Sequence, residues 1–228
     1  MIPLHDDVPA ERAPVLTVGL MAACVAVFLW QAGLDDEAAL RAVYSFGLIP
    51  AVLFDQIALH DSLAVIPPGA TIFTSMFLHG GWGHLLGNML YLWIFGNNVE
   101  DRLGHGRFLL FYLACGVAAA LAQALPDPDS QVPMVGASGA ISGVLGAYLL
   151  LYPRARVLVL IPIGFILHTV RLPAMVVLGL WFVLQLVSQA FSAPGEGGVA
   201  FLAHIGGFVA GMVLLPLALL TVHGRARR

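Results

Sequence analysis

Six long apolar segments follow one another along the chain, and the short stretches between them carry nearly all of its charge. A helix needs about 20 apolar residues to cross the hydrocarbon core of a bilayer. The pattern therefore predicts an all-α polytopic membrane protein with six transmembrane helices. These run over residues 15–31, 83–99, 108–125, 135–152, 174–191 and 199–222.

Two further segments are partly apolar but do not fit a simple span. The first outer loop, residues 33–81, is long and contains an apolar run at 46–54. A loop of this length usually carries structure of its own, so we expect short helices in the outer interface. Residues 157–170 are interrupted by Pro162 and Gly164 and are too short to span. They predict an interfacial hairpin beside the cytoplasmic face.

Composition supports one membrane domain and excludes several other classes. The 228 residues are 60% hydrophobic and only 10% charged, whereas soluble domains carry about 25% charged residues. The ten basic residues are all arginine and form no patch interleaved with aromatic residues, so nucleic-acid binding is not expected. Cys24 and Cys115 lie within apolar runs and lack the spacing of a disulfide or zinc motif.

Arginine placement predicts the orientation of the helices. Cytoplasmic connections are enriched in Arg and Lys. Only Arg41 lies on an odd-numbered connection; the other nine arginines lie on even-numbered connections or at the termini. The chain should thus have a cytoplasmic N-terminal segment (1–14), a six-span domain (15–222) and a basic cytoplasmic tail (223–228). We expect a multi-pass protein of the cell (inner) membrane, with the bilayer as its surroundings.

Four polar residues of the predicted spans should lie in one layer beneath the outer surface. His84 and Asn88 are in the second span, Ser138 is about one turn below the start of the fourth, and His204 is a similar depth into the sixth. Polar groups inside a membrane are costly, which makes them functional candidates. By contrast, Ser142 has no other polar residue to support a functional role, so we expect it to pack against a neighbouring helix.

Glycines predict that the fourth and sixth spans pack together. His204, Gly207 and Gly211 share one helix face, and the two glycines form a GxxxG pattern that lets backbones approach closely. Gly139 belongs to a similar small-residue stripe beside Ser138 on the fourth span. This packing would bring Ser138 next to His204.

A serine hydroxyl is a poor nucleophile unless a neighbouring base accepts its proton, and a neutral imidazole can do so. The spans contain no carboxylate that could orient the imidazole, so the residues predict a Ser–His dyad. Backbone N–H groups near Ser138, with His84 and Asn88, could supply donors to an oxyanion.

The motifs around these residues resemble those of the rhomboid family of intramembrane serine proteases. They are Gly136-Ala137-Ser138-Gly139, Ala203-His204-Ile205-Gly206-Gly207, His79 with His84 and Asn88, and Glu100 with Arg102. The resemblance implies a six-helix rhomboid-like bundle with Ser138 as nucleophile and His204 as base. It also implies an oxyanion site at His84 and Asn88, with structural roles for His79, Glu100, Arg102 and the motif glycines.

The resemblance further implies cleavage of other proteins' transmembrane segments near the outer face, without a metal or cofactor. The substrate helix would enter past the fifth span and the first loop. Two features depart from the family pattern: the first outer loop lacks a Trp-Arg pair, and Ser142 occupies a position where an aromatic residue often supports the imidazole. The sequence does not predict an oligomeric state.

Other function classes fit less well. A catalytically silent rhomboid-like chaperone or quality-control protein remains the alternative, although such relatives lose the serine or the histidine. A transporter usually shows inverted repeats or charges near the midplane. A metalloprotease built on His79, His84 and His204 would need a further carboxylate or cysteine ligand.

Overall fold

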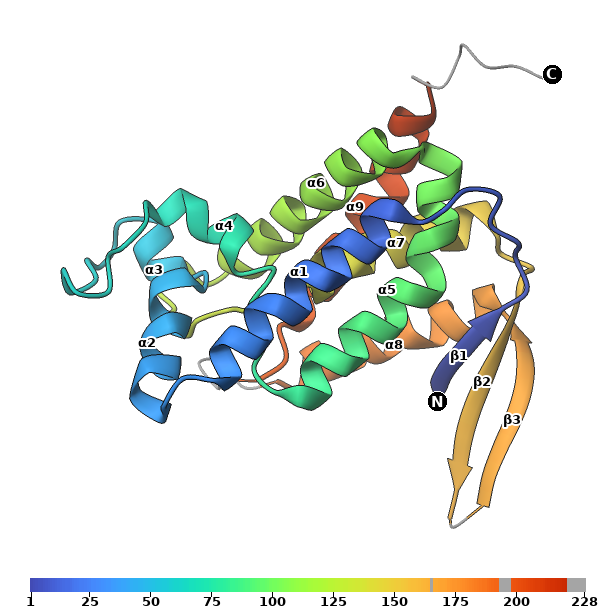
Figure 1. The fold of residues 1–228 in the computed structure, drawn as a ribbon, viewed down its shortest axis with the longest axis horizontal. Helices are drawn as coiled ribbons and strands as arrows, with labels where there is room; N and C mark the ends of the chain where they lie inside the picture. Colours follow the sequence, from blue (N-terminus) through green and yellow to red (C-terminus); the bar gives the residue numbers. More distant parts are fainter. Residues whose placement is uncertain (165, 193–197, 221–228) are drawn as a thin grey trace.

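The computed structural model describes residues 1–164, 166–192 and 198–220, and most of them are helical (Figure 1). The predicted end of the sixth span at Val222 and the basic tail 223–228 lie outside the described residues. The longer helices are α1 (Val15–Ala32), α5 (Trp82–Leu103), α6 (His105–Ala124), α7 (Ser138–Leu151), α8 (Ala174–Phe191) and α9 (Phe201–Leu220).

Four of these helices, α1, α6, α8 and α9, are long and apolar enough to cross a membrane, which makes the chain a multi-pass membrane protein. The other two, α5 and α7, do not meet this standard of length and apolarity, so the count of six spans stays a prediction. Helix α5 has 22 residues but carries charges near its end, at Glu100, Asp101 and Arg102. Helix α7 has 14 residues. The fourth span was expected over 135–152, but the helix begins only at Ser138 and ends at Leu151.

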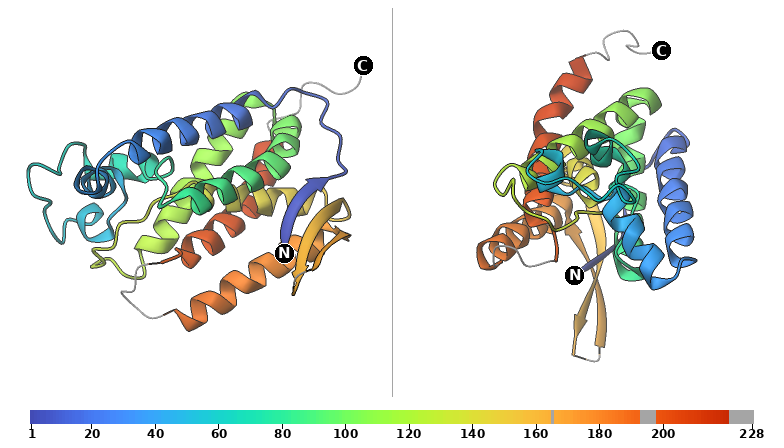
Figure 2. Two further views of the ribbon diagram at one scale, coloured as in Figure 1. Left: turned by 60° about the horizontal axis from the view of Figure 1, so that its bottom comes forward. Right: turned by 90° about the vertical axis from the view of Figure 1, so that its left-hand side faces the viewer.

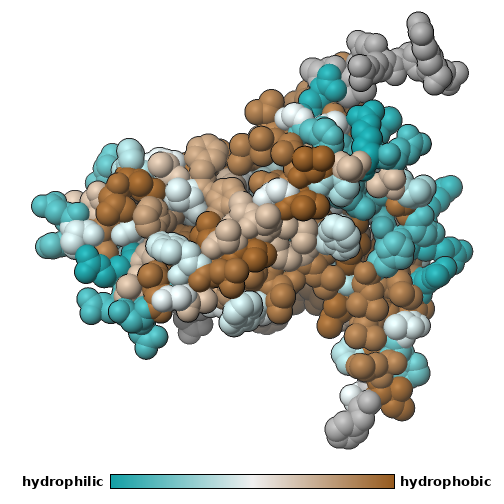
Figure 3. All heavy atoms as spheres, viewed as in Figure 1, coloured by the Kyte–Doolittle hydropathy of each residue, from teal (hydrophilic) through white to brown (hydrophobic). Residues whose placement is uncertain are grey.

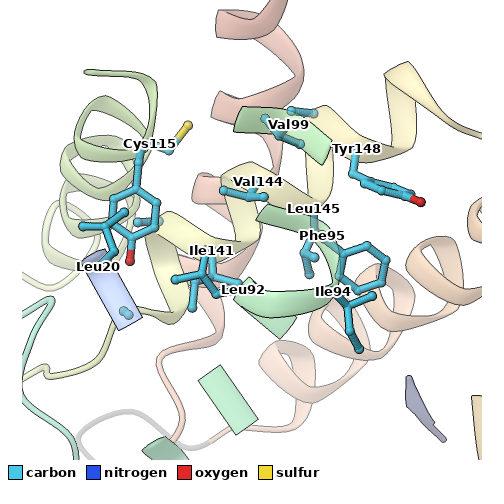
Figure 4. Close-up of a cluster of buried hydrophobic side chains, with 14 of the residues drawn as sticks. Leu20, Leu92, Ile94, Phe95, Val99, Cys115, Ile141, Val144, Leu145 and Tyr148 are labelled. Atoms are coloured by element: carbon cyan, nitrogen blue, oxygen red, sulfur yellow. The ribbon is translucent and has the colours of Figure 1, made fainter. Parts of the chain in front are cut away.

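Helix α7 lies at the centre of the bundle, between α5, α6 and α9. Its residues 139–148 are all buried. Figure 4 shows the core that forms around it: Ile141, Val144 and Leu145 of α7 face apolar side chains of α5, and Leu20 of α1 and Cys115 of α6 belong to the same cluster. A short, fully surrounded helix holds its first residue inside the protein and away from lipid.

Glycines bring α7 and α9 into backbone contact, as the small-residue pattern predicted. A Cβ atom on Gly207 would collide with the carbonyl oxygen of Gly139, and one on Gly211 would collide with that of Gly143. Only glycine allows this approach, and the approach sets the distance between the beginnings of the two helices.

Short helices occupy the connection between α1 and α5 at one end of the bundle. They are α2 (Asp36–Phe46), α3 (Pro50–Leu53), the 3₁₀ turn η1 (Pro68–Ala70) and α4 (Thr71–Thr74). Asp35 caps α2 by accepting the Ala38 N–H at 2.8 Å. Leu48 exchanges backbone hydrogen bonds with Met134, which ties this connection to the segment before α7.

At the other end of the bundle, the hairpin expected at residues 157–170 is present as two paired strands. The expectation of an all-α protein is therefore wrong at this end, where three strands form an antiparallel sheet. Strand β1 (Ile2–Asp6) belongs to the predicted N-terminal segment and pairs with β2 (Arg156–Ile163), which pairs with β3 (Ile166–Pro173). Alternate β-branched residues, Val157, Val159 and Ile161, favour a strand over a helix. Gly164, with φ of +60°, supplies the turn.

The two ends of the bundle therefore differ in structure. Figure 1 and Figure 2 show that the β2–β3 hairpin lies at the end opposite α2 and α3 and projects sideways from the bundle. In Figure 3, apolar side chains cover the middle of the bundle, and hydrophilic ones gather at both ends. We call the end that carries the sheet the arginine-rich end, because Arg12, Arg102, Arg107, Arg154, Arg156 and Arg171 lie on its elements and connections.

Candidate active site

Ser138 and His204 lie together where α7 and α9 begin. Ser138 is the first residue of α7, not one turn inside the helix as expected, and His204 is in the first turn of α9. Their side chains form a hydrogen bond with 2.8 Å between Ser138 Oγ and His204 Nε2. Gln123 of α6 helps to hold this turn by accepting the Ala203 N–H at 3.2 Å. An alcohol and an imidazole at this distance can exchange a proton.

An open cavity of about 950 Å³ leads to this pair. His84, Asn88, Ser138 and His204 all line it, so the four polar residues predicted to share one layer do share one cavity. The cavity lies at the α2–α4 end of the bundle, because Leu48 and Ile72 also belong to its wall.

His84 rests against the backbone that precedes Ser138. The Gly80 N–H donates to His84 Nδ1 at 3.2 Å, so Nε2 carries the hydrogen in the neutral ring. Gly136 has φ of +124°, and a Cβ atom there would come within 2.7 Å of the His84 ring. The Gly136 N–H in turn donates to the Ser75 carbonyl at 2.8 Å. Glycine at 136 is thus needed for both its backbone conformation and the room it leaves.

Asn88 lies one turn below His84 on the same face of α5 and is 6% exposed. Among the described residues, its amide nitrogen, Nδ2, is buried without a hydrogen-bond partner. A buried donor left unpaired is unfavourable, and Asn88 lines the same cavity as Ser138, so Nδ2 is a candidate donor to a group bound there. The free N–H groups at the start of α7, beginning with Gly139, are further donors.

Two residues of α8 contact His204, and their part in the site was not predicted. Gln185 Oε1 lies 2.8 Å from His204 Nδ1, and the ring of Trp181 lies 5.8 Å from the imidazole, centroid to centroid, with 36° between the planes. The one signal for Gln185 in the sequence was a polar residue within an apolar span. Trp181 supports the imidazole from a different helix than the one that holds Ser142.

Ser142 and the backbone of His79 are hydrogen-bonded within the protein, whereas His79 Nε2 is buried without a partner among the described residues. The Ser142 hydroxyl donates to the Ser138 carbonyl at 2.6 Å, which agrees with a packing role. The His79 backbone N–H donates to Gln31 Oε1 at 3.0 Å and links the segment before α5 to α1. The His79 ring packs edge-on against His84, with 5.2 Å between centroids. His79 therefore contacts the site through His84.

Glu100 lies far from this cavity. Its carboxylate accepts hydrogen bonds from the start of α1 and from His105. Within the described ranges, no contact between Glu100 and Arg102 accompanies these bonds. Over the same residues, no three His, Cys, Asp or Glu side chains are grouped as metal ligands would be. The expected absence of a metal or cofactor stays a prediction.

Comparison with known proteins identifies the family. Residues 69–220, which include every residue of the candidate site, match the model of the rhomboid domain. The chain is 38% identical to Rhomboid protease GluP of Bacillus subtilis over 148 residues, which is 64% of this chain and 26% of that protein. It is 32% identical to the mitochondrial Rhomboid protein 1 of Saccharomyces cerevisiae over 151 residues, 63% of this chain and 40% of the relative. Although the match covers well under half of these relatives, it covers most of the present chain, which belongs to the rhomboid family.

Proposed function

We propose that this protein is an intramembrane serine endopeptidase that cleaves transmembrane segments of other membrane proteins. The observation that carries the proposal is the 2.8 Å hydrogen bond between Ser138 Oγ and His204 Nε2, inside a cavity of a membrane-embedded bundle. The names of the relatives, several of which are called proteases, support the same reaction class.

The residues would act in sequence. Ser138 Oγ attacks the carbonyl carbon of the scissile peptide bond while its proton passes to His204 Nε2. Asn88 Nδ2, His84 Nε2 and the N–H groups at the start of α7 then stabilise the oxyanion. His204 gives its proton to the leaving amine, which leaves an acyl group on Ser138. Water, deprotonated by His204, releases that group and restores the serine.

The location of the site favours cleavage near one membrane surface. The cavity lies at the α2–α4 end, and every described arginine except Arg41 lies at the opposite end. By the distribution of arginine, the α2–α4 end is the outer one, and six spans place both termini in the cytoplasm of a cell with this protein in its inner membrane. The proposal counts α5 and the short, enclosed α7 among those spans. Helix α8, mostly exposed and apolar, borders the site and is the side from which a substrate helix would enter.

Labelling with a fluorophosphonate tests the assignment. The wild-type protein in detergent should be labelled and should cut a model transmembrane substrate, whereas Ser138→Ala and His204→Ala should do neither while still inserting into membranes. EDTA should have no effect. Persistent labelling of Ser138→Ala, or loss of cleavage with EDTA, would overturn the proposal. A wild-type protein that binds transmembrane segments but is neither labelled nor active would instead be the non-catalytic chaperone.

A further inference from the structure

His204 is hydrogen-bonded through both ring nitrogens. Nε2 meets Ser138 Oγ, and Nδ1 meets Gln185 Oε1, each at 2.8 Å. An amide oxygen only accepts hydrogen bonds, so the hydrogen of the neutral imidazole belongs on Nδ1. This tautomer leaves the lone pair of Nε2 free for the Ser138 proton, which is the arrangement that a general base requires.

The orientation of Gln185 is itself fixed. Its Nε2 donates to the carbonyl of Trp181, one turn earlier in α8, at 3.4 Å. The amide oxygen is thereby directed to His204, and the Trp181 ring lies beside the imidazole from the same helix. A carboxylate would be a stronger acceptor, but an ionised group is costly in a membrane helix. A neutral amide gives the acceptor without the charge.

We propose that Gln185 is a positioning residue that makes the pair a Ser138–His204–Gln185 chain. It fixes the tautomer and the ring plane of His204 and, when His204 takes the serine proton, accepts a charge-assisted hydrogen bond from Nδ1. This role rests on the proposed function. It also makes the general base depend on α8, the least buried of the long helices, in which only Ala174, Val177 and Leu178 are buried.

Three variants test the role through kcat and KM for a transmembrane substrate. Gln185→Met keeps the length of the side chain and removes the acceptor, and kcat should fall about 10- to 100-fold with little change in KM. Gln185→Glu keeps an acceptor oxygen and should recover most of kcat. Gln56→Met, the same substitution at an exposed residue of the connection between α3 and η1, should stay within about threefold of wild type. Equal losses in Gln185→Met and Gln185→Glu, or none in Gln185→Met, would overturn the role.

A measurement without catalysis separates this inference from the proposed function. Nitrogen-15 NMR of histidine-labelled protein reports the tautomer of His204, assigned by comparison with His204→Gln. The wild type should show the hydrogen on Nδ1, and Gln185→Met should lose that preference. If the hydrogen is on Nε2 in the wild type, the positioning role is wrong even in an active enzyme. If the tautomer is as expected but the protein cleaves nothing, the proposed function fails and the hydrogen-bonded chain stands.

The β2–β3 hairpin carries a second, independent inference. Its base is buried, with Val157 and Val159 fully inaccessible, whereas Ile166 and Leu167 near its tip are 61% and 66% exposed. Ile166 and Leu167 are consecutive in β3, so they point to opposite faces of the sheet. The tip is therefore apolar on both sides, and Figure 3 shows apolar side chains along the projecting hairpin.

Charge at the base of the hairpin indicates what covers this tip. Arg156 and Arg171 are exposed on the strands that lead to it. A hairpin with apolar residues at its tip and arginines near its start fits the boundary between acyl chains and anionic headgroups. β3 is the outer strand of the sheet, and its outward backbone groups would be unpaired in hydrocarbon, so hydrated headgroups suit it better than the bilayer core.

We infer that the hairpin tip rests in the headgroup region of the protein's own bilayer at the arginine-rich end, with Arg156 and Arg171 beside anionic phosphates. A spin label tests this in vesicles of phosphatidylcholine and phosphatidylglycerol. At Leu167→Cys the label should be more accessible to oxygen than to a water-soluble nickel chelate. At Asp61→Cys, in the exposed connection between α3 and η1, the order should reverse. Both native cysteines are buried, so the protein without an added cysteine serves as the control for background labelling.

Each other outcome contradicts the membrane contact. Nickel accessibility at Leu167→Cys equal to that at Asp61→Cys would place the tip in water. Dipolar broadening between Leu167→Cys labels would show a second copy of the chain on the hairpin instead. Vesicles of phosphatidylcholine alone should make the Leu167→Cys label shallower; an unchanged depth would overturn the part assigned to the arginines.

Discussion

The carboxylate of Glu100, at the arginine-rich end of α5, receives both the backbone N–H and the hydroxyl of Thr17, each at 2.7 Å. It also accepts the N–H of Leu16 at 2.9 Å, so three donors at the start of α1 converge on one buried side chain. The first N–H groups of a helix have no partner within it, and a negative charge there is favourable. Glu100 therefore caps a helix from which it is far removed in sequence.

Replacing Glu100 by Gln should lower the free energy of unfolding by about 1–3 kcal/mol, because the donors lose a charged acceptor. Unfolding in mixed micelles with increasing dodecyl sulfate measures this. The same substitution at Glu37, which is exposed in the first turn of α2, should change stability by less than about 0.5 kcal/mol. Equal losses in the two variants would contradict the capping role.

Asn88→Ala should reduce the rate of cleavage while leaving stability unchanged or improved. Loss of one oxyanion donor typically costs ~10²–10³ in rate, and the buried Nδ2 has no hydrogen-bond partner to lose among the described residues. Steady-state kinetics and thermal unfolding of the same preparation measure the two effects.

The control is Asn98→Ala, at the other end of α5. The Asn98 amide donates to the Val8 carbonyl at 3.0 Å, so this variant should lose stability and retain its rate. If both asparagine variants lose stability and activity together, Asn88 is a structural residue and the oxyanion role is wrong.

Gly211→Ala should destabilise the protein by about 1–3 kcal/mol, because the new methyl group collides with the backbone of Gly143 and forces α7 and α9 apart. Labelling of Ser138 should slow in the same variant, since both members of the reactive pair lie at the beginnings of these helices.

Gly179→Ala in α8 is the matched control. A Cβ atom there meets nothing within 4 Å, and stability should be equal or slightly higher. A loss at Gly179 equal to that at Gly211 would show that helix separation is not the cause.

Sequence patterns predicted the features that depend on one helix at a time. The apolar runs gave the approximate positions of the long helices, and the glycine faces predicted the contact between α7 and α9. With that contact, the proximity of Ser138 and His204 followed from residue types alone, because few polar side chains occur within the spans. Membrane helices make such reasoning effective, since lipid leaves few places for a hydrogen-bonding group.

Features that depend on how separate segments meet were not predictable in this way. Gln185 appeared only as an isolated polar residue, because its contact with His204 depends on the position of α8 beside α9. The partners of Glu100 are Leu16, Thr17 and His105, whereas the family pattern directed attention to Arg102. A hairpin was predicted at residues 157–170, but the third strand of the sheet was missed. Strand β1 lies in a short N-terminal segment, and its pairing with β2 requires a contact between segments about 150 residues apart in the sequence.

That sheet is joined to the bundle by a buried acid, which makes its docking sensitive to pH. The Tyr148 hydroxyl in α7 donates to Asp6 Oδ2 in β1 at 2.5 Å. Burial raises the pKa of Asp6, and the hydrogen bond from Tyr148 opposes this effect without overcoming it. Below the ordinary pKa of an aspartate, about 4, the side chain is protonated in both the folded and the unfolded chain. As the pH rises, the unfolded chain releases this proton first, so the contribution of Asp6 to stability falls until the pH passes its pKa in the folded protein.

Asp6→Asn keeps an acceptor for Tyr148 without the charge and should therefore be more stable than wild type at pH 7, with little difference at pH 4. Thermal unfolding at both pH values measures this, with Asp61→Asn in an exposed connection as the control. A stabilisation by Asp6→Asn that is larger at pH 4 than at pH 7 would reverse the sign and rule out burial of the charge as the cause.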